Sequence, residues 1–309
     1  MSKKLPKVAV AGLGVVGEGV ALRLAEDPSY ELIGVAARDL TKERDAALRE
    51  ISITDDFETL VGIGPDIIVD ALPVGGAGAD LINRALCAGV SIASANKQAI
   101  AGNMQRFHQL SKENHAQFRY SASVGGGVPM IETINAIRGS RDVQELHAIV
   151  NGTVNFILTA LGDGAEFDAV IADAQRRGFA EPDPTADLSG ADAKAKISIL
   201  SFEAFDREIE ANTITPRALD RALAEKIQAE KKQWRQVTRA YPDGDKVAAT
   251  IDIVCVEDNP FFAGTRNEGN ALNILLTNGD AEEVSGLGAG RAPTVDAIFG
   301  DLGVISKTL

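Results

Sequence analysis

Short apolar runs alternate with helix-like segments along the first part of the chain. Residues 7–11 are apolar and are followed by glycines, and residues 15–26 mix apolar with charged positions at spacings that suit a helix. Further strand-like runs lie at 32–37, 67–71, 90–95 and 117–122. Strands separated by helices predict βαβ units, so we expect a parallel, doubly wound sheet of the α/β class.

The pattern changes after Pro129. Residues 130–138 have helical spacing, 144–150 resemble a strand, and a long polar and helical region extends from 154 to about 240. Residues 247–256 alternate between apolar and polar positions and 271–277 are apolar, which predicts strands of a separate sheet with helices on one face. Residues 285–309 are rich in glycine and then helical, and we expect them to return to the first domain.

Composition narrows the class of protein. A length of 309 residues suggests two domains, and 45% hydrophobic with 24% charged residues is typical of a soluble globular protein. The net charge of −13 argues against nucleic-acid binding, and the sequence contains no apolar stretch long enough to predict a membrane span. With only Cys87 and Cys255 we expect a reducing, cytoplasmic location, and the few histidines and cysteines argue against a zinc site.

A glycine pattern typical of dinucleotide binding follows the first predicted strand. The six residues are Gly12, Leu13, Gly14, Val15, Val16 and Gly17. In such a pattern Gly12 permits the tight turn, Gly14 lets the backbone approach a pyrophosphate, and Gly17 lets the helix pack close to the strand. The helix N-terminus then offers N–H groups to the phosphates. By itself the pattern is also compatible with a purely structural turn.

The end of the second predicted strand bears on the choice of cofactor. Arg38 stands where an acidic residue would bind the ribose hydroxyls of NAD, and a guanidinium suits the 2′-phosphate of NADP. Asp39 follows directly, so the sequence leaves both NADP and NAD open, with NADP slightly favoured. Arg38 could equally be a solvated loop residue.

A cluster of acidic residues, prolines and lysines lies at 178–196. Pro182, Pro184 and Gly190 predict a loop, and a helix begins near Asp192, so Asp192 and Lys196 are four residues apart on one helix face. Such a pair is most often an exposed ion pair. A loop of acidic residues at a helix start also suits the binding of a cationic amino group.

These residues, together with others in the same order along the whole chain, resemble the homoserine dehydrogenase family. The resemblance rests on Ala95-Asn96-Lys97, the segment 120–129, the segment 151–158, the spaced residues Glu181, Asp187, Asp192 and Lys196, the glycine-rich segment 286–290, and Thr294, Ala297 and Asp301. Several ordered motifs are more specific than any one of them.

The resemblance implies a Rossmann-type domain formed by residues 1–129 and 286–309, with an inserted α+β substrate-binding and dimerisation domain at 130–285. It implies reversible hydride transfer between NAD or NADP and the C4 of L-aspartate 4-semialdehyde, giving L-homoserine on the path to threonine and methionine. The expected partners are this small-molecule substrate and a second copy of the chain, with no nucleic acid and no membrane.

The resemblance also implies roles for individual residues. Lys196 is expected as the general acid/base, with Asp192 orienting it, and Lys97 reaching both cofactor and substrate. Glu181, Asp187 and Asp192 are expected at the substrate ammonium group. Gly152 and Thr153 are expected at the substrate carboxylate, and Gly288 and Gly290 at the cofactor.

The chain departs from the family pattern at two positions. Ser121 stands where the family usually has an acidic residue, and Phe179 where a tyrosine usually precedes the substrate glutamate. The family binds a monovalent cation, usually sodium, with backbone carbonyls that correspond to Val124, Gly126 and Val128 and with the acidic side chain. Because Ser121 is neutral, we expect weak cation binding or none. The Phe179 and Ser121 departures keep open a same-fold oxidoreductase with another small substrate, and the resemblance implies a form without an ACT or aspartate kinase domain. A nucleotide-binding regulatory protein without catalysis is a further alternative, against which the presence of Lys97, Asp192 and Lys196 argues.

Overall fold

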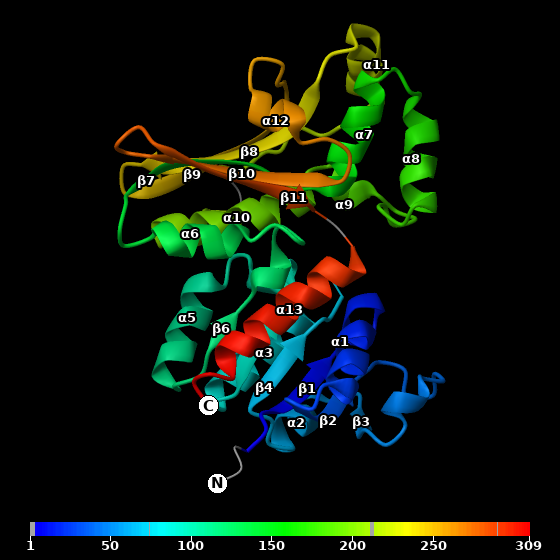
Figure 1. The fold of residues 1–309 in the computed structure, drawn as a ribbon, viewed down its shortest axis with the longest axis vertical. Helices are drawn as coiled ribbons and strands as arrows, with labels where there is room; N and C mark the ends of the chain where they lie inside the picture. The colour runs from blue at the N-terminus through cyan, green and yellow to red at the C-terminus, as the bar shows by residue number, and fades with distance from the viewer. Residues whose placement is uncertain (1–3, 74, 211–212, 289) are drawn as a thin grey trace. The chain divides into compact units, whose positions relative to one another are not determined.

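In the computed structural model, which describes residues 4–73, 75–210, 213–288 and 290–309, the chain forms two units (Figure 1). The described residues up to Ser123 together with Arg291–Leu309 form unit 1, and Val124–Gly290 form unit 2. The C-terminal segment therefore returns to the first unit. The domain boundaries at 129 and 286 stay a prediction about which segments act as one domain.

Unit 1 contains a six-stranded parallel sheet. Its strand order is β3-β2-β1-β4-β5-β6. β2 and β3 extend the sheet on one side of β1 and β4 to β6 on the other, so the topological switch point lies between β1 and β4. In a doubly wound sheet, ligands bind outside the carboxyl ends of the strands at this point. The strands are β1 (Lys7–Ala11), β2 (Glu31–Ala36), β3 (Ile53–Thr54), β4 (Ile67–Asp70), β5 (Ser91–Ser94) and β6 (Phe118–Arg119).

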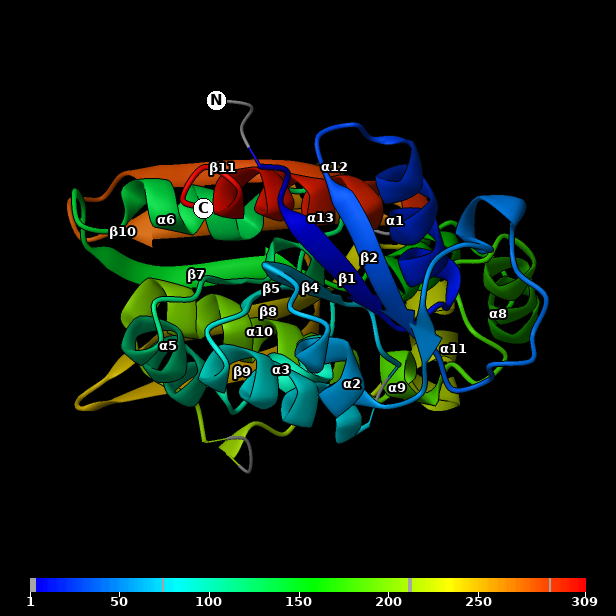
Figure 2. The same cartoon turned by 90° about the horizontal axis from the view of Figure 1, so that it is seen from below.

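Helices cover both faces of this sheet (Figure 2). α1 (Val15–Glu26) and α13 (Arg291–Ile305) pack together on one face, where Val20, Leu24, Ile298 and Leu302 are buried with the strands. The other face is covered chiefly by α2, α3 and α5. The remaining helical segments of unit 1 are η1 (Ala46–Leu48), α2 (Phe57–Gly62), α3 (Ala77–Cys87), α4 (Lys97–Ile100), α5 (Met104–Glu113) and η2 (Ser121–Ser123).

Unit 2 contains a five-stranded antiparallel sheet in the order β11-β10-β7-β8-β9. The strands are β7 (Val143–Ile149), β8 (Trp234–Asp243), β9 (Lys246–Cys255), β10 (Gly269–Leu276) and β11 (Ala281–Leu287). The helices are α6 (Met130–Ile137), α7 (Gly152–Gly162), α8 (Phe167–Arg176), α9 (Thr185–Leu188), α10 (Ala191–Phe205), α11 (Arg221–Glu230) and α12 (Pro260–Gly264).

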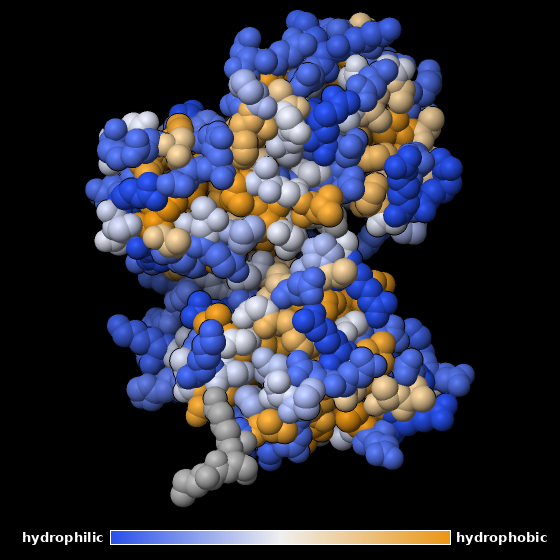
Figure 3. Space-filling model, in the orientation of Figure 1, coloured by the Kyte–Doolittle hydropathy of each residue, from blue (hydrophilic) through white to orange (hydrophobic). Residues whose placement is uncertain are grey.

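The two faces of this antiparallel sheet differ. α6 and α10 lie along one face, and α12 lies on the other, where Ile149 and Ala271 are buried with Phe262. Further along that second face, Arg239 of β8 is exposed and Leu275 of β10 is half-buried. Hydrophobic side chains are visible between hydrophilic ones over the region of β7, β9 and β10 (Figure 3).

Two parts of the sequence interpretation are wrong. The region expected to stay helical up to residue 240 ends in a strand, β8, which begins at Trp234 and contains alternating buried and exposed positions after Gln236. The segment from 285, expected to be glycine-rich loop and then helix, begins inside β11. β11 is mostly exposed and carries two glutamates, so it lacks the apolar pattern by which a strand is recognised. The fold class is confirmed nonetheless: a parallel sheet with helices on both faces, with an α+β unit inserted between its two chain segments.

Among residues 4–73, 75–210, 213–288 and 290–309, each helix is too short or too polar to cross a bilayer.

Candidate active site

The glycine turn after β1 leaves room for a phosphate group. Gly12 has a φ of +92°, and a Cβ atom there would lie 2.5 Å from the carbonyl oxygen of Ala71. Gly17 is equally restricted, since its Cβ would lie 1.8 Å from the carbonyl oxygen of Gly12. Gly14, the N-cap of α1, faces open space, because its Cβ would meet no heavy atom within 4 Å. The free N-terminus of α1 and this opening fit a dinucleotide pyrophosphate.

The end of β2 places Arg38 in solvent. Arg38 is exposed just beyond the last buried residues of the strand. The carboxylate of Asp39 accepts hydrogen bonds from the backbone N–H and the hydroxyl of Thr41, at 2.9 and 2.7 Å. These hydrogen bonds lower the pKa of Asp39. Arg44 binds the backbone carbonyl of Asp39 at 2.6 Å. Asp39 therefore closes its own turn, whereas Arg38, which is exposed like Asp39, precedes that turn.

A buried polar chain leads from β4 to Lys97. The fully buried carboxylate of Asp70 accepts hydrogen bonds from the hydroxyl of Ser94 at 2.8 Å and the backbone N–H of Leu72 at 3.1 Å. The same hydroxyl accepts from the N–H of Asn96, whose side-chain oxygen caps α4 through the N–H of Ala99. Lys97 is the first residue of that helix. Burial raises the pKa of Asp70 to about 6.

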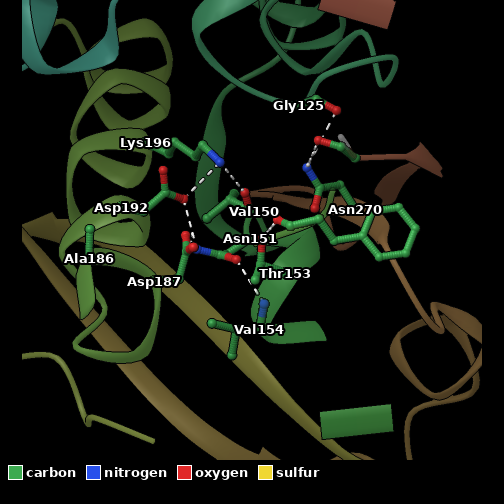
Figure 4. Close-up of polar contacts among 12 residues, drawn as sticks. Gly125, Val150, Asn151, Thr153, Val154, Ala186, Asp187, Asp192, Lys196 and Asn270 are labelled. Atoms are coloured by element: carbon green, nitrogen blue, oxygen red, sulfur yellow. Dashed lines mark hydrogen bonds and ion pairs between the residues drawn. The ribbon is translucent and has the colours of Figure 1, made fainter. Parts of the chain in front are cut away.

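In unit 2, Asp192 and Lys196 form a largely buried ion pair on α10. Lys196 Nζ lies 2.8 Å from Asp192 Oδ2 and donates to the carbonyl oxygen of Val150 at 2.8 Å. Both side chains are at most 15% exposed. The alternative of an exposed helix-surface pair is therefore wrong. The pair lies where β7 gives way to α7, so the ammonium group of Lys196 is directed toward the start of α7 (Figure 4).

Asn151 joins this pair to a second carboxylate. Its side-chain nitrogen donates to Asp192 Oδ2 at 2.9 Å and to Asp187 Oδ1 at 2.8 Å. Its side-chain oxygen accepts from the N–H of Val154 at 2.9 Å and so caps α7. Asp187 belongs to the short helix α9 and is half-buried. Two carboxylates, one ammonium and a helix N-terminus therefore meet around one amide (Figure 4).

The other predicted substrate residues differ in their surroundings. Gly152 opens α7, and a Cβ there would lie 2.8 Å from the carbonyl oxygen of Glu268. Thr153 is buried and donates its hydroxyl to the carbonyl oxygen of Phe179 at 2.5 Å. The ring of Phe179 packs against Phe156 in the core of unit 2. Glu181 is exposed, and among the described residues no hydrogen bond or ion pair involves its carboxylate.

Hydrogen bonds within the protein engage part of the segment at which weak cation binding or none is expected. Ser121 donates both its N–H and its hydroxyl to the carboxylate of Asp301, at 2.9 and 2.8 Å. Within that turn, the N–H of Val128 binds the carbonyl of Gly125, and the carbonyl of Val128 accepts from Met130. The carbonyl of Val128 is thus engaged within the protein, and weak cation binding or none stays a prediction.

The segments 124–128 and 286–290 meet at a buried amide. Asn270, fully buried in β10, donates to the carbonyl oxygens of Gly125 and Gly288 at 3.4 and 3.3 Å. The N–H of Gly288 binds the carbonyl of Glu268 at 3.0 Å, and Gly290 is exposed just before α13. Ala289, within the predicted segment 286–290, lies outside the described residues. Gly288 is thus packed against Asn270, with no room for a side chain.

The structure brings the predicted residues together in two groups. Unit 1 holds Gly12 to Gly17, Arg38 and Lys97 at the carboxyl ends of its strands. Unit 2 holds Gly152, Thr153, Asp187, Asp192 and Lys196 around the start of α7, whereas Glu181 stands apart in an exposed loop. Among the described residues, no cluster of three or more histidine, cysteine and acidic side chains could hold a metal ion.

Sequence interpretation missed two polar residues of this region. Asn151 was part of a matched segment without a role of its own, although an asparagine before Gly-Thr at the start of an apolar run is a typical N-cap. Asp70 ends a wholly apolar strand, and an acidic residue in that place is the available signal of a buried polar network.

Comparison with known proteins agrees with this arrangement. The family model "Homoserine dehydrogenase" matches residues 129–302, and "Homoserine dehydrogenase, NAD binding domain" matches 12–121. The chain is 27% identical to a homoserine dehydrogenase of Bacillus subtilis, over 99% of this chain and 74% of that one. It is 31% identical to an NAD(+)-dependent homoserine dehydrogenase of Pseudomonas canavaninivorans, over 77% of this chain and 70% of that one.

Solved structures give the same result. The crystal structure of a homoserine dehydrogenase from Thiobacillus denitrificans superimposes with a TM-score of 0.87 at 26% identity, covering 97% of this chain and 72% of that one. The match to an NAD-binding domain model, at the glycine turn described above, indicates a nicotinamide cofactor. On these matches, the chain belongs to the homoserine dehydrogenase family.

Proposed function

We propose that this chain catalyses the reversible, NAD(P)-dependent reduction of L-aspartate 4-semialdehyde to L-homoserine. The observation that carries the proposal is the group of Asp187, Asp192 and Lys196 around the capped start of α7. This group offers negative charge to a substrate ammonium group, N–H groups to its carboxylate, and a proton donor between them. An amino acid with a reactive side chain is the ligand that needs all three.

Lys196 is the general acid/base of this proposal. When bound, the nicotinamide cofactor supplies or accepts the hydride at C4 of the substrate. During reduction the carbonyl oxygen gains negative charge, and Lys196 Nζ donates a proton to it, leaving a neutral amine that solvent reprotonates. Asp192 Oδ2 holds Nζ at 2.8 Å. In the oxidation direction the same atom takes the proton of the homoserine hydroxyl.

The substrate ends are assigned to opposite sides of Asn151. The backbone N–H groups at Gly152 and Thr153, at the positive end of α7, bind the carboxylate. Asp187 and Asp192 bind the ammonium group. Glu181, exposed and with an unbonded carboxylate among the described residues, completes this acidic side when substrate is present. Lys97, at the carboxyl end of β5, contacts both cofactor and substrate.

The cofactor is assigned to the segment Gly12–Gly17, and Gly288 and Gly290 are the further cofactor-binding residues of this proposal. We favour NADP slightly over NAD, because Arg38 is exposed at the end of β2 while Asp39 is occupied by Thr41. A guanidinium pairs with a 2′-phosphate, and an acidic residue engaged in its own turn is not offered to the ribose.

A homodimer is proposed through the second face of the antiparallel sheet, beyond α12. This part carries a cluster of acidic and basic side chains. Arg239 donates to the carboxylate of Glu145, and Glu145 Oε1 lies 2.6 Å from His147 Nε2. Half-buried Leu275 and Tyr241 flank it. A surface that combines apolar residues with both charges can be complementary to itself across a twofold axis. The exposed free thiols of Cys87 and Cys255 support a reducing, cytoplasmic location.

The experiment that tests the function is a turnover assay of homoserine oxidation, with NAD and NADP measured side by side. We expect turnover with both cofactors and a higher kcat/KM with NADP. A panel of other amino acids and 2-hydroxy acids serves as the control for substrate choice. Turnover of a panel member but not of homoserine would favour a same-fold oxidoreductase with another substrate, and Phe179, packed on Phe156, is the departure that motivates it.

A further inference from the structure

The side-chain amide of Asn151 is fully used within unit 2. It is 3% exposed, and both N–H bonds and the oxygen have partners: Asp187, Asp192 and the N–H of Val154. The Asp192 oxygen that accepts from Asn151 is also the one that pairs with Lys196 (Figure 4). One amide therefore connects the ion pair, the second carboxylate and the start of α7.

The two carboxylates need such a connection. Asp187 and Asp192 come from different helices, α9 and α10, and both accept from the same nitrogen at 2.8 and 2.9 Å. Two carboxylates that lie close together repel each other, and Lys196 Nζ pairs with Asp192 while it also donates to the carbonyl oxygen of Val150. A neutral group with two N–H donors can hold both of them without adding a charge that would compete with a substrate ammonium group.

We propose that Asn151 is a positioning residue that sets the spacing between Asp187, Asp192 and the N-terminus of α7. The inference rests on the substrate-binding roles proposed above for these groups. Because the same amide caps α7, the ammonium-binding and carboxylate-binding sides of the site are fixed to each other by one side chain. An α-amino acid, whose ammonium and carboxylate groups share one carbon atom, is then favoured over a β- or γ-amino acid, in which these two groups lie further apart.

Two substitutions separate this role from simple helix capping. Asn151→Ser keeps a side-chain oxygen that caps a helix as well as asparagine does, but it removes both N–H donors. Asn151→Asp keeps the shape and the capping oxygen, and it places a third carboxylate beside the other two. At lower pH the new carboxyl group becomes protonated and regains one donor, because like charges raise its pKa.

The measurements are kcat/KM for homoserine across a pH series, with wild type beside both variants. We expect Asn151→Ser to lower kcat/KM by about tenfold to a hundredfold, the worth of hydrogen bonds to charged groups, mainly through KM for homoserine. The kcat/KM of Asn151→Ser relative to wild type should stay constant with pH. The kcat/KM of Asn151→Asp relative to wild type should rise as the pH falls. The matched control is Asn259→Ser, which alters the N-cap of α12.

The outcomes distinguish this inference from the proposed function. No homoserine turnover by wild type contradicts the function itself. An active wild type with Asn151→Ser within twofold of it, or with a constant Asn151→Asp ratio, overturns only the role of Asn151. Asn151→Ser could lose activity together with thermal stability while Asn259→Ser loses neither. In that case the kcat/KM of Asn151→Asp relative to wild type decides. If this ratio is constant with pH, Asn151 has a capping role and the proposal is overturned; if it rises as the pH falls, the proposal is supported.

Discussion

Lys196 is the residue at which proton transfer can be separated from binding. Lys196→Ala should lower kcat for homoserine by about a hundredfold to ten-thousandfold, the usual contribution of a general acid/base. Dinucleotide binding, measured by fluorescence titration, should be nearly unchanged, because the glycine turn belongs to unit 1.

Lys194→Ala is the matched control for this change. Lys194 lies on the same helix and is directed to the carbonyl of Ile214 instead of the ion pair. It should retain most of the activity. If Lys196→Ala retains turnover within a few-fold of wild type, Lys97 becomes the better candidate for the acid/base.

Arg38 decides between the two cofactors. Arg38→Ala should raise the Kd for NADPH by about tenfold or more and leave that for NADH within about twofold, because only NADPH has a phosphate for the guanidinium to bind. Arg44→Ala, in the same loop, is the control, since Arg44 binds a backbone carbonyl. Equal effects of Arg38→Ala on both cofactors would show that this side chain does not contact the ribose.

Asp70 is expected to make the stability of unit 1 depend on pH. Its pKa is raised from 3.8 to about 6 in the folded state, because the carboxylate is buried. Between these two values the folded protein binds a proton that the unfolded chain does not, so stability falls as the pH rises through this window and levels off above it. From pH 5 to pH 8 the loss is roughly 1–2 kcal/mol.

Asp70→Asn removes this dependence, since an amide can donate to Ser94 and accept from Leu72 without ionising. We expect the variant to gain stability relative to wild type between pH 5 and pH 8. Hydrogen exchange of the β4 and β5 amides, with both proteins compared at the same pH, measures the difference. If the difference in stability between Asp70→Asn and wild type is the same at pH 5 and at pH 8, Asp70 does not titrate in this window.

At the scale of elements, the turn between β1 and α1 combines two different demands on glycine. A Cβ at Gly12 would collide with the carbonyl of Ala71, whereas a Cβ at Gly14 meets no protein atom. Gly12→Ala should therefore lower both thermal stability and dinucleotide binding. Gly14→Ala should leave the melting temperature unchanged and weaken dinucleotide binding by about tenfold or more, because the backbone can no longer approach the pyrophosphate. Dinucleotide binding unaffected by Gly14→Ala would place the phosphates elsewhere.

Elements with a strong apolar pattern could be predicted, and elements stabilised by neighbours could not. β1 and α1 were predicted at their observed bounds, because a buried parallel strand and an amphipathic helix each have a distinct pattern. β11 is held by its pairing with β10, from Gly269 opposite Leu287 to Leu275 opposite Ala281, and its own residues are mostly exposed. The two-residue strand β3 likewise depends on β2.

The candidate site shows the same division. Spacing placed Asp192 and Lys196 on one helix face, and they pair there. Spacing could not show that the pair is buried, nor that Asn151, some 40 residues away, binds Asp192. Long-range contacts of this kind depend on how α7 and α10 pack. Ser121 is a second example, since its partner Asp301 lies 180 residues further along the chain.

At the scale of the whole molecule, the sheet face beyond α12 is the surface through which we propose the homodimer. Glu145 pairs with Arg239 there, and their side chains are 13% and 44% exposed. Exposed ion pairs contribute little to stability, and their worth increases when a partner surface excludes water. A second copy of the chain, with the same cluster related by a twofold axis, would provide this exclusion.

The dimer is tested by placing a charge on this face. Leu275→Glu introduces a carboxylate directly across from Glu145, its neighbour in β7, and in a dimer the new charge would be buried without a partner. We expect wild type to sediment with twice the mass of one chain, and the variant to sediment as a monomer at the same concentration. Val304→Glu, on α13 of unit 1 and partly exposed, is the matched control and should remain dimeric. A wild-type monomer would contradict the homodimer, and a dimeric Leu275→Glu variant with unchanged affinity would place the interface on another surface.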